Sequence, residues 1–589
     1  MKIDYNRDNY LSEFSIKTLQ DRYMIEGEKS PQDAFARAAV AFSDNDAHAQ
    51  RLYDYASKLW FMFSTPILSN GGTDRGQPIS CFLNQPDDSR EGITSHYTEN
   101  AFLSSFGGGI GGSWSALRSV GQKTSKGSES TGVIPFLKVV DAEMLAFSQG
   151  VTRRGSYAAW LDFSHPEIEE FMDMRKPTGG DVNRKSTNLH HGVTISDAFM
   201  ELVEKATRIP GFDDSWDLID PHSGEVIKTV PAKALWVKLL QNRVETGEPY
   251  VMFKDTVQND LPIWQKNLGL QVHHSNLCSE ITLATDTDRT AVCCLSSVNL
   301  EEYDEWKDND MFIPDLVRML DNVLTHFIDT APASLHRARY SAFRERSIGL
   351  GAMGLHAHLQ RHNIPFESAM AKGRNIQMFK RIKSEALRGS KQLFKERGPC
   401  PDGIGFDVRN SHLLAIAPNA SSSIICGNTS PSIEPYRANA FTQKTTSGSS
   451  LLKNEYLEHA LDEIGYNTDE VWKSIVTNGG SVQHLDFLDD WTKEVFRTAV
   501  EIEQKWIIEF AGDRQKDICQ SQSLNVFFPA NVTKQELHAI HLSAWKKGVK
   551  TMYYLRSEAF KRADKVSDAV LRQYIFDSID DNDCLACEG

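Results

Sequence analysis

The sequence lacks the marks of a secreted, membrane-spanning or polynucleotide-binding protein. Its longest fully apolar runs, such as residues 59–63, are far too short to span a bilayer, and its polar first residues contain no signal-peptide core. Nine cysteines among 589 residues are too few for a disulfide-stapled scaffold. Basic residues number 64 against 79 acidic ones, and the resulting net charge of −15 disfavours binding to the phosphates of long nucleic acids. We therefore expect a cytoplasmic protein that engages neither membrane nor nucleic acid.

The composition is otherwise that of a large globular protein, with 40% hydrophobic and 24% charged residues. Residues 1–75 are expected to be helical. Ser30 and Pro31 form a typical helix start, and apolar side chains recur at helical spacing from there to Phe63. At the other end of the chain, the acidic and aperiodic residues 566–589 predict a flexible tail.

From about residue 76 to 510, short apolar runs alternate with longer amphipathic segments. The apolar runs predict strands at 79–83, 193–195, 291–295 and 422–426. The amphipathic segments predict helices at 197–206, 231–246 and 313–331. Stretches rich in Gly and Ser predict loops at 107–112, 121–132, 148–156 and 445–450. This alternation favours an α/β architecture with a largely parallel sheet or barrel, whose loops carry the functional site.

One glycine-rich stretch has the residue spacing of a nucleotide-binding motif. Residues 107–112 satisfy the spacing G-x-G-x-x-G, which binds dinucleotides when it joins a strand to a helix. Here residues 97–105 before it read as a helix, and no acidic residue stands at the end of a following strand. We therefore expect a loop whose backbone approaches a ligand or another strand closely.

The histidines and cysteines do not form a recognisable metal motif. The adjacent pairs His190-His191 and His273-His274 should point their side chains apart. A single C-x-x-C is also too little for a structural zinc site. We expect no metal bound in this chain.

Two groups of residues suggest thiol chemistry. If the segment Asn276-Leu277-Cys278-Ser279-Glu280 is extended, Asn276, Cys278 and Glu280 share one face, which then offers an amide, a thiol and a general base. A buried cysteine beside a surface Asn and Glu is the alternative. Near the end of the chain, Cys584 and Cys587 have the spacing of a thiol–disulfide exchange pair, or are an incidental pair in the tail.

Several further motifs occur in a meaningful order. They are Ser64-Thr65-Pro66, Ile79-Ser80-Cys81-Phe82-Leu83, Val292-Cys293-Cys294-Leu295-Ser296, Pro418-Asn419-Ala420-Ser421-Ser422 and Lys550-Thr551-Met552-Tyr553-Tyr554. With the Asn276 to Glu280 segment and the tail cysteines, the chain resembles the large, catalytic subunit of class I ribonucleotide reductases over roughly residues 10–589. The resemblance implies an α/β fold, a ten-stranded α/β barrel with a central finger loop (76–565), preceded by a helical N-terminal domain (1–75) and followed by the tail (566–589).

The resemblance also implies a radical mechanism. Cys278 would become a thiyl radical and take the 3′-hydrogen of a ribonucleoside diphosphate, while Glu280 accepts the 3′-hydroxyl proton and Asn276 holds the ribose hydroxyls. Cys81 would protonate the leaving 2′-hydroxyl and end in a disulfide with Cys293. Cys584 and Cys587 would reduce that disulfide by thiol–disulfide exchange. Thioredoxin or glutaredoxin would then reduce them again.

The radical would come from outside this chain. In the family, tyrosines matching Tyr553 and Tyr554 receive it from a second, small subunit that holds a dinuclear metal centre. No cofactor is expected in this chain itself. Two alternatives stay open: an adenosylcobalamin-dependent reductase, and a non-catalytic nucleotide-binding protein that kept the fold.

Nucleotide contacts follow from the same resemblance. Those matching the substrate site are Thr65, Ser80, Asn419, Ala420, Ser421 and Ser422. Those matching the site for a deoxynucleoside triphosphate effector are Asp88, Ser89, Arg118, Gln149 and Arg154, with Arg153 as the alternative to Arg154. Family members dimerise around the effector site, so a homodimer is implied.

The chain departs from the family pattern in two places. It begins about where the family's helical domain starts, so we expect no N-terminal ATP-binding cone and no inhibition by dATP through it. Cys294 stands beside Cys293, and because the two point to opposite faces of a strand, only one can meet Cys81; we expect Cys293. The remaining cysteines, Cys400, Cys426 and Cys519, are expected to be structural.

Overall fold

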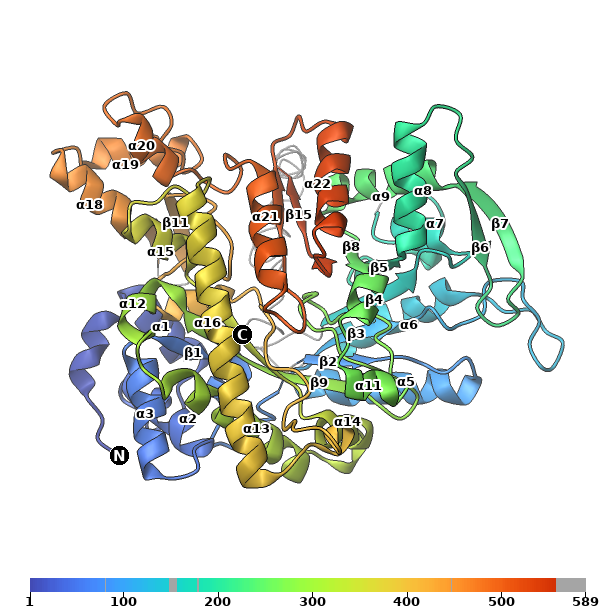
Figure 1. Cartoon of the computed structure of the whole chain (residues 1–589), viewed down its shortest axis with the longest axis horizontal. Coiled ribbons are helices and arrows are strands. Elements are labelled where there is room, and N and C mark those ends of the chain that lie inside the picture. Colours follow the sequence, from blue (N-terminus) through green and yellow to red (C-terminus); the bar gives the residue numbers. More distant parts are fainter. Residues whose placement is uncertain (80, 148–155, 177–178, 446–447, 558–589) are drawn as a thin grey trace.

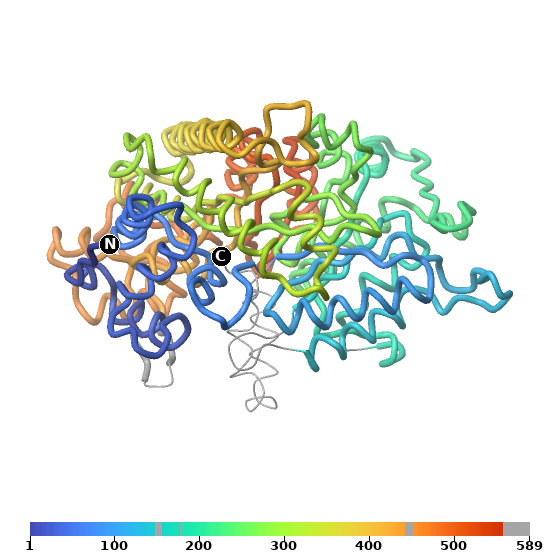
Figure 2. The backbone as a smooth tube through the Cα atoms, turned by 90° about the horizontal axis from the view of Figure 1, so that it is seen from below, coloured from blue at the N-terminus to red at the C-terminus, as the bar shows by residue number. Residues whose placement is uncertain are grey.

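The computed structural model describes residues 1–79, 81–147, 156–176, 179–445 and 448–557, without the side chains of 442–450. Within these residues, no helix is both long enough and apolar enough to cross a membrane. In Figure 2 the N-terminal helices lie at one end of the molecule and the β6–β7 hairpin (Ser215–Ile219 and Val226–Pro231) at the other.

The chain begins with a helical layer. Its helices are η1 (Tyr5–Tyr10), α1 (Glu13–Arg22), α2 (Pro31–Ala41), α3 (Asp46–Ser57) and α4 (Thr65–Asn70). The predicted helix start is confirmed, because Ser30 and Asp33 form a capping box around Pro31.

The expectation of helix through Phe63 is wrong. Helix α3 ends at Ser57, Leu59 turns the chain with a positive φ of 60°, and the buried residues Phe61–Phe63 form strand β1. This strand pairs antiparallel with a later strand at Val298. The N-terminal segment thus contributes an edge strand to the main sheet.

The first half of a barrel follows. Its strands are β2 (Cys81–Asn84), β3 (Gly109–Ser113), β4 (Ser156–Asp162), β5 (His190–Ile195) and β8 (Tyr250–Phe253). Each is parallel to the next. The helices between them are α5 (Arg90–Ser105), α6 (Val133–Ala146), α7 (Ile168–Asp173), η2 (Val182–Arg184), α8 (Asp197–Arg208) and α9 (Ala232–Thr246). The predicted alternation of strands and helices is confirmed here, including α8 and α9.

The second half closes the barrel. Its named strands are β9 (Ala291–Asn299), β10 (Ile348–Met353), β13 (Val526–Phe528), β14 (Thr551–Met552) and β15 (Leu555–Ser557). Strand β10 is parallel to β9 and bridges in parallel to Leu414, Ile416 bridges to Gln522, and β13 is parallel to β15. Antiparallel contacts of β2 with β9 and of β8 with β14 join the two halves. The strands of the first half, together with the named strands and the bridged segments at residues 414–416 and 522 of the second, form the expected α/β barrel.

Helices surround this barrel, as Figure 1 shows. Those of the second half are α10 (Lys254–Asn259), α11 (Ile263–Asn267), η3 (Leu300–Glu302), α12 (Tyr303–Trp306), α13 (Phe312–Thr330), η4 (Ala333–Leu335), α14 (His336–Glu345), α15 (Leu355–Arg361), α16 (Ala369–Arg397), η5 (Pro401–Gly403), α17 (Ala420–Ile425), α21 (Gln504–Gln515) and α22 (Lys534–Lys546). The predicted helix at 313–331 is α13. A separate small core lies under α18 (Glu455–Glu463), α19 (Asp469–Thr477) and α20 (Asp490–Val495), at the upper left of Figure 1.

Three local expectations are wrong. Residues 422–426 are helical, because Asn419 adopts the left-handed conformation (φ 57°) and starts α17. Residues 107–112 are largely strand β3. Residue 445 ends β11 (Ala440–Thr445), and residues 448–450 begin β12 (Gly448–Lys453), which pairs with β11. Glycine and serine were misleading in these strands because pairing with neighbouring segments outweighs local propensity.

The buried residues divide into an outer core and an inner one. The large cluster fills the space between the barrel and its helices. A second buried cluster joins inward-facing strand residues to side chains from other segments inside the barrel. It contains Cys81, Cys278, Cys293, Tyr553 and Tyr554. The barrel interior therefore gathers the reactive side chains that the sequence singled out.

Candidate active site

The segment carrying Cys278 lies inside the barrel as a turn. Residues 277–279 turn, with Ser279 at a positive φ of 68° and its N–H donating to the Asn276 carbonyl at 3.3 Å. The conditional expectation of an extended segment is therefore wrong. Asn276, Cys278 and Glu280 are nevertheless completely buried. The barrel wall, rather than strand alternation, determines where these side chains lie.

Strand β3 holds one side of this turn through its glycines. A ring nitrogen of His274 lies 2.9 Å from the Gly111 carbonyl oxygen. A Cβ atom at Gly111 would lie 2.2 Å from the Ser275 carbonyl oxygen and 2.8 Å from the Asn276 Cα. The glycine-rich stretch thus permits the close backbone approach that the sequence predicted, within a strand instead of a loop.

The opposite half of the barrel holds the other side of the turn. The Ser523 hydroxyl donates to the Cys278 carbonyl at 2.6 Å, and the Thr551 hydroxyl donates to the Ser279 carbonyl at 2.6 Å. The Ser521 N–H donates to the Glu280 carbonyl at 2.8 Å. Both barrel halves therefore fix the backbone on which Cys278 sits.

Two further cysteines face each other next to this turn. Cys81 on β2 and Cys293 on β9 are directly opposite partners in the antiparallel pair. Such partners have Cβ atoms about 4.5–5.5 Å apart, so a modest adjustment brings the two sulfurs within bonding distance. The side-chain nitrogen of Asn276 lies 4.0 Å from the Cys81 Sγ. Cys294 points the other way, with its thiol donating to the Leu320 carbonyl in the outer core.

Burial keeps the second thiol protonated. It raises the pKa of Cys293 well above its usual value, with the nearby Cys294, Cys81 and Glu280 adding to the rise. The side-chain N–H of Gln520 donates to the Cys293 Sγ at 3.5 Å. On the same side, the Ser523 hydroxyl donates to a Glu280 carboxylate oxygen at 3.1 Å. The site thus contains buried thiols beside a carboxylate, an arrangement suited to moving protons and hydrogen atoms.

Three buried tyrosines pack against one another in the inner cluster, with their rings tilted or edge-on. The ring centroids of Tyr553 and Tyr554 are 4.3 Å apart, and the Tyr250 ring lies 4.7 Å from the first and 5.1 Å from the second. Burial, followed by the charge of Glu248, raises the pKa of Tyr554, so its hydroxyl stays protonated. That hydroxyl lies 3.2 Å from a ring nitrogen of His190. The group is a continuous aromatic path that includes ionisable phenols.

Sequence reasoning missed the charged group behind these rings. The buried Glu248 carboxylate lies 2.7 Å from a His190 nitrogen, 2.9 Å from a His191 nitrogen and 3.1 Å from Arg175. Burial acts to raise the pKa of Glu248, but Arg175 and His190 outweigh this effect and hold the pKa well below its usual value. The paired histidines therefore converge on one carboxylate, contrary to the expectation that they diverge. The only signal in the sequence was an acidic residue just before the buried strand β8.

The residues matched to phosphate binding meet at the carboxyl end of β9. The Ser296 hydroxyl accepts from the Ser64 N–H at 3.3 Å. This hydrogen bond fixes the start of α4, where Thr65 is the first residue. The Ser297 hydroxyl donates to the Asn419 side chain at 2.8 Å, which holds the start of α17. Thr65 is hydrogen-bonded to the Tyr23 hydroxyl at 3.0 Å. Ala420 is half-buried, and Ser421 and Ser422 are buried.

The residues matched to effector binding are partly described. Asp88 and Arg118 form an ion pair at 2.9 Å, and Ser89 caps α5 by accepting from the Gly92 N–H. Ser89 also borders a cleft of about 680 Å³ against α14, whose walls include the carboxylates of Asp87, Glu91 and Asp288. The walls also include His336 and Arg337, so the cleft is mixed in charge.

Five predicted residues lie outside the described part of the chain. They are Ser80, Gln149, Arg154, Cys584 and Cys587. Arg153 lies there too, so the choice between Arg153 and Arg154 stays a prediction.

Comparisons with known proteins agree over almost the whole chain. Two family descriptions match, "Ribonucleotide reductase, all-alpha domain" at residues 10–76 and "Ribonucleotide reductase, barrel domain" at 79–407 and 403–555. The ribonucleoside-diphosphate reductase large subunit of Invertebrate iridescent virus 3 is 44% identical over all of both chains. That of Caenorhabditis elegans is 33% identical over all of this chain and 82% of its own length. The class Id ribonucleotide reductase alpha subunit of Actinobacillus ureae has a similar structure, with a TM-score of 0.82, 34% identity and coverage of 95% of this chain and 98% of its own. The chain therefore belongs to the family of ribonucleotide reductase large subunits.

Proposed function

We propose that the chain is the catalytic subunit of a class I ribonucleoside-diphosphate reductase, which converts ribonucleoside diphosphates to deoxyribonucleoside diphosphates. The observation that carries this proposal is the buried thiol pair of Cys81 and Cys293, directly opposite one another beside the turn that presents Cys278. A merely structural cysteine needs no such partner. The names of the relatives supply the reaction.

In the proposed reaction Cys278, as a thiyl radical, takes the 3′-hydrogen of the ribose. Glu280 accepts the 3′-hydroxyl proton and Asn276 holds the ribose hydroxyls. Cys81 gives its proton to the 2′-hydroxyl, which leaves as water. The substrate gains two electrons and a hydrogen at C2′, supplied by the second thiol, and the Cys81 and Cys293 thiols become a disulfide. Glu280 returns its proton to the 3′-oxygen, and the 3′-hydrogen returns from Cys278 to regenerate its radical. The high pKa of Cys293 supports this role, because a thiol that stays protonated can supply hydrogen.

The disulfide must be reduced before the next turnover. We assign this step to Cys584 and Cys587, which would exchange with it and then be reduced by thioredoxin or glutaredoxin. A buried disulfide inside a barrel is inaccessible to a folded reductant, which supports a carrier in the tail. The same proposal includes a homodimer and a cytoplasmic location.

The radical would reach Cys278 through Tyr554 and Tyr553. Their 4.3 Å ring separation and the shared buried cluster with Cys278 support this path. A large subunit implies a small one as partner. We propose that the small subunit generates the radical at a dinuclear metal centre, with no cofactor held in this chain. The class I relative favours this source over adenosylcobalamin.

The nucleotide sites belong to the same proposal. The substrate diphosphate would lie among Thr65, Ser80 and residues 419–422. The attachment of Ser64, next to Thr65, and of Asn419 to the end of β9 supports this site. A deoxynucleoside triphosphate effector would contact Asp88 and Ser89 through its ribose and Arg118 through its phosphates, with Gln149 and Arg154 reading the base. Binding a phosphate requires Arg118 to loosen its ion pair with Asp88.

The direct test replaces Cys278 by Ser and measures reduction of cytidine diphosphate with a small subunit and dithiol reductant. We expect no deoxycytidine diphosphate above background, because the serine hydroxyl does not form a comparable radical. The matched control is Cys426→Ser, a buried cysteine outside the inner cluster, which should keep turnover. Detectable turnover by Cys278→Ser would refute the proposal. Binding of nucleoside diphosphates without turnover by the unaltered chain would favour the non-catalytic alternative.

A further inference from the structure

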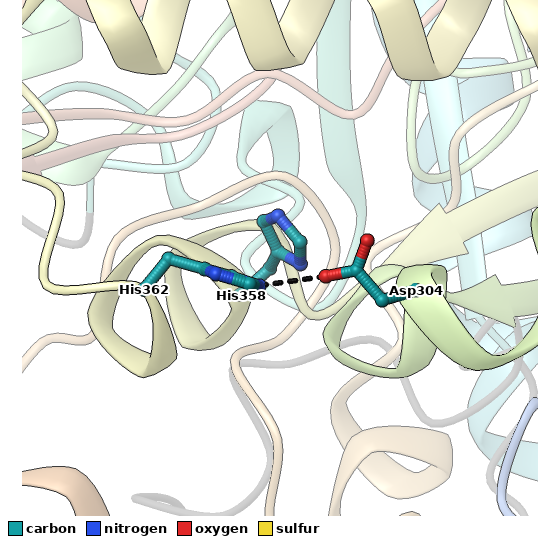
Figure 3. A group of neighbouring side chains, drawn as sticks. All are labelled: Asp304, His358 and His362. Carbon is teal, nitrogen blue, oxygen red and sulfur yellow. Dashed lines mark ion pairs between the residues drawn. The ribbon is translucent and has the colours of Figure 1, made fainter.

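Three side chains with metal-binding atoms meet on the outside of the barrel, away from the inner cysteines. Asp304 lies on α12, and His358 and His362 lie one turn apart at the end of α15 (Figure 3). Each offers one ligand atom, and these atoms all lie within 4.8 Å of one another. Residues four apart on a helix share a face, so both histidines turn toward the same point.

His358 is the unusual member of this cluster. Its side chain is completely buried, and neither ring nitrogen has a hydrogen-bond partner among the described residues. Nearly all buried polar atoms in proteins are paired, so an imidazole with two unpaired nitrogens calls for an explanation.

The other two side chains supply what the buried histidine lacks. His362 and Asp304 are in contact, with 2.8 Å between a ring nitrogen and a carboxylate oxygen, and each is about one-third exposed. Two imidazoles, a carboxylate and an open side for water are the ligand set of many tetrahedral zinc sites.

The neighbouring charges are balanced. Lys307 lies 2.5 Å from one Asp304 oxygen and leaves the other for a ligand. Arg361 pairs with Glu302 at 2.9 Å. Arg374 is a further cation whose charge acts on His358. Glu302 offsets the charge of Arg361, whereas Lys307 shares the Asp304 carboxylate with the ion and Arg374 stays close to His358, so these cations weaken but do not forbid the binding of a divalent ion.

We propose that Asp304, His358 and His362 bind a divalent transition metal of the zinc type, with water as the fourth ligand. Ligand atoms in such a site are about 3.3 Å apart, given bonds of about 2.05 Å, so separations of up to 4.8 Å must shorten by up to about 1.5 Å. Helix α12 follows β9 and helix α15 follows β10, two parallel strands paired at Asn299 and Met353. The ion would link α12, which follows the strand that carries Cys293, to α15. This role is structural and separate from the proposed catalysis.

The test is a titration of the full-length chain, first stripped of metal with a chelator, with Co²⁺ as a visible probe. We expect tetrahedral cobalt absorption without the thiolate charge-transfer bands that cysteine ligands produce. Added Zn²⁺ should displace the cobalt, because such sites prefer zinc. Asp304→Asn and His362→Gln alter exposed side chains, so both should fold, and both should weaken cobalt binding at least about 10-fold.

The matched control is His459→Gln, an exposed histidine on α18 that should leave the titration unchanged. Zn²⁺ should also raise the melting temperature of the unaltered chain and of this control, but not of His362→Gln. Equal cobalt affinity in the unaltered chain, Asp304→Asn and His362→Gln would overturn the proposal. Cobalt bands that show thiolate ligands and vanish in the Cys584→Ser/Cys587→Ser variant would overturn it as well.

Discussion

Replacing Gly111 by Ala tests how tightly the barrel wall positions the turn that carries Cys278. The added Cβ would lie 2.2 Å from the Ser275 carbonyl oxygen, a backbone atom that cannot rotate away. Real Cβ contacts are essentially never below 3.0 Å, so the turn must retreat by at least 0.8 Å. A misplacement of about 1 Å costs roughly 100-fold in rate, equal to about 2.7 kcal/mol in the activation barrier. The overpacked core should lose only about 1–3 kcal/mol of stability.

The assay is the turnover number for cytidine diphosphate reduction at saturating substrate, together with thermal unfolding of the same preparations. Gly373→Ala is the control, because Gly373 lies on α16 and a Cβ there meets no atom within 4 Å. We expect the control to keep full turnover and to gain up to about 1 kcal/mol of stability. Unchanged turnover of folded Gly111→Ala would refute the inference that this contact sets the position of Cys278.

Two other substitutions probe the aromatic path and the outer core. Tyr554→Phe keeps the ring but removes the proton that must leave on oxidation, so turnover should fall to background at an unchanged melting temperature, while the exposed Tyr466→Phe stays active. Although burial raises it, Arg346 and Arg409 lower the pKa of Asp321 to about 2. Because the folded pKa lies below the unfolded value of about 3.9, this group's stabilisation, on the order of 2–3 kcal/mol, is present above pH 4 and is lost as the pH falls toward 2. Asp321→Asn should therefore unfold more easily at pH 7 and show a flatter acid limb in thermal unfolding.

Much of the site could be predicted because its reactive residues occur in short sequence motifs. Cys293 and Cys294 are adjacent in the sequence, and strand alternation alone implies that only one of them faces Cys81. The register of β2 and β9 places Cys293 in that position. The pair Tyr553-Tyr554 could be recognised for the same reason, because its two residues are adjacent in the sequence.

The features that could not be predicted from the sequence depend on contacts between distant segments. The turn at Cys278 comes from Gly111 and Thr551, which lie far from it in the chain and close to it in the barrel. The expectation of no metal considered only histidine pairs and cysteines close in sequence. It overlooked Asp304 and His358, which are brought together by the pairing of β9 with β10. Tertiary pairing also overrode the loop propensity of glycine in β3.

The most direct measurement is a single turnover without external reductant, using the Cys584→Ser/Cys587→Ser chain with its small subunit. Each turnover converts one cytidine diphosphate and two thiols into one deoxycytidine diphosphate, one water and one disulfide. We predict about one product per active chain and, by peptide mapping, a disulfide joining Cys81 to Cys293 with Cys294 still a thiol. Continued turnover under these conditions, or product formed without that disulfide, would contradict the account.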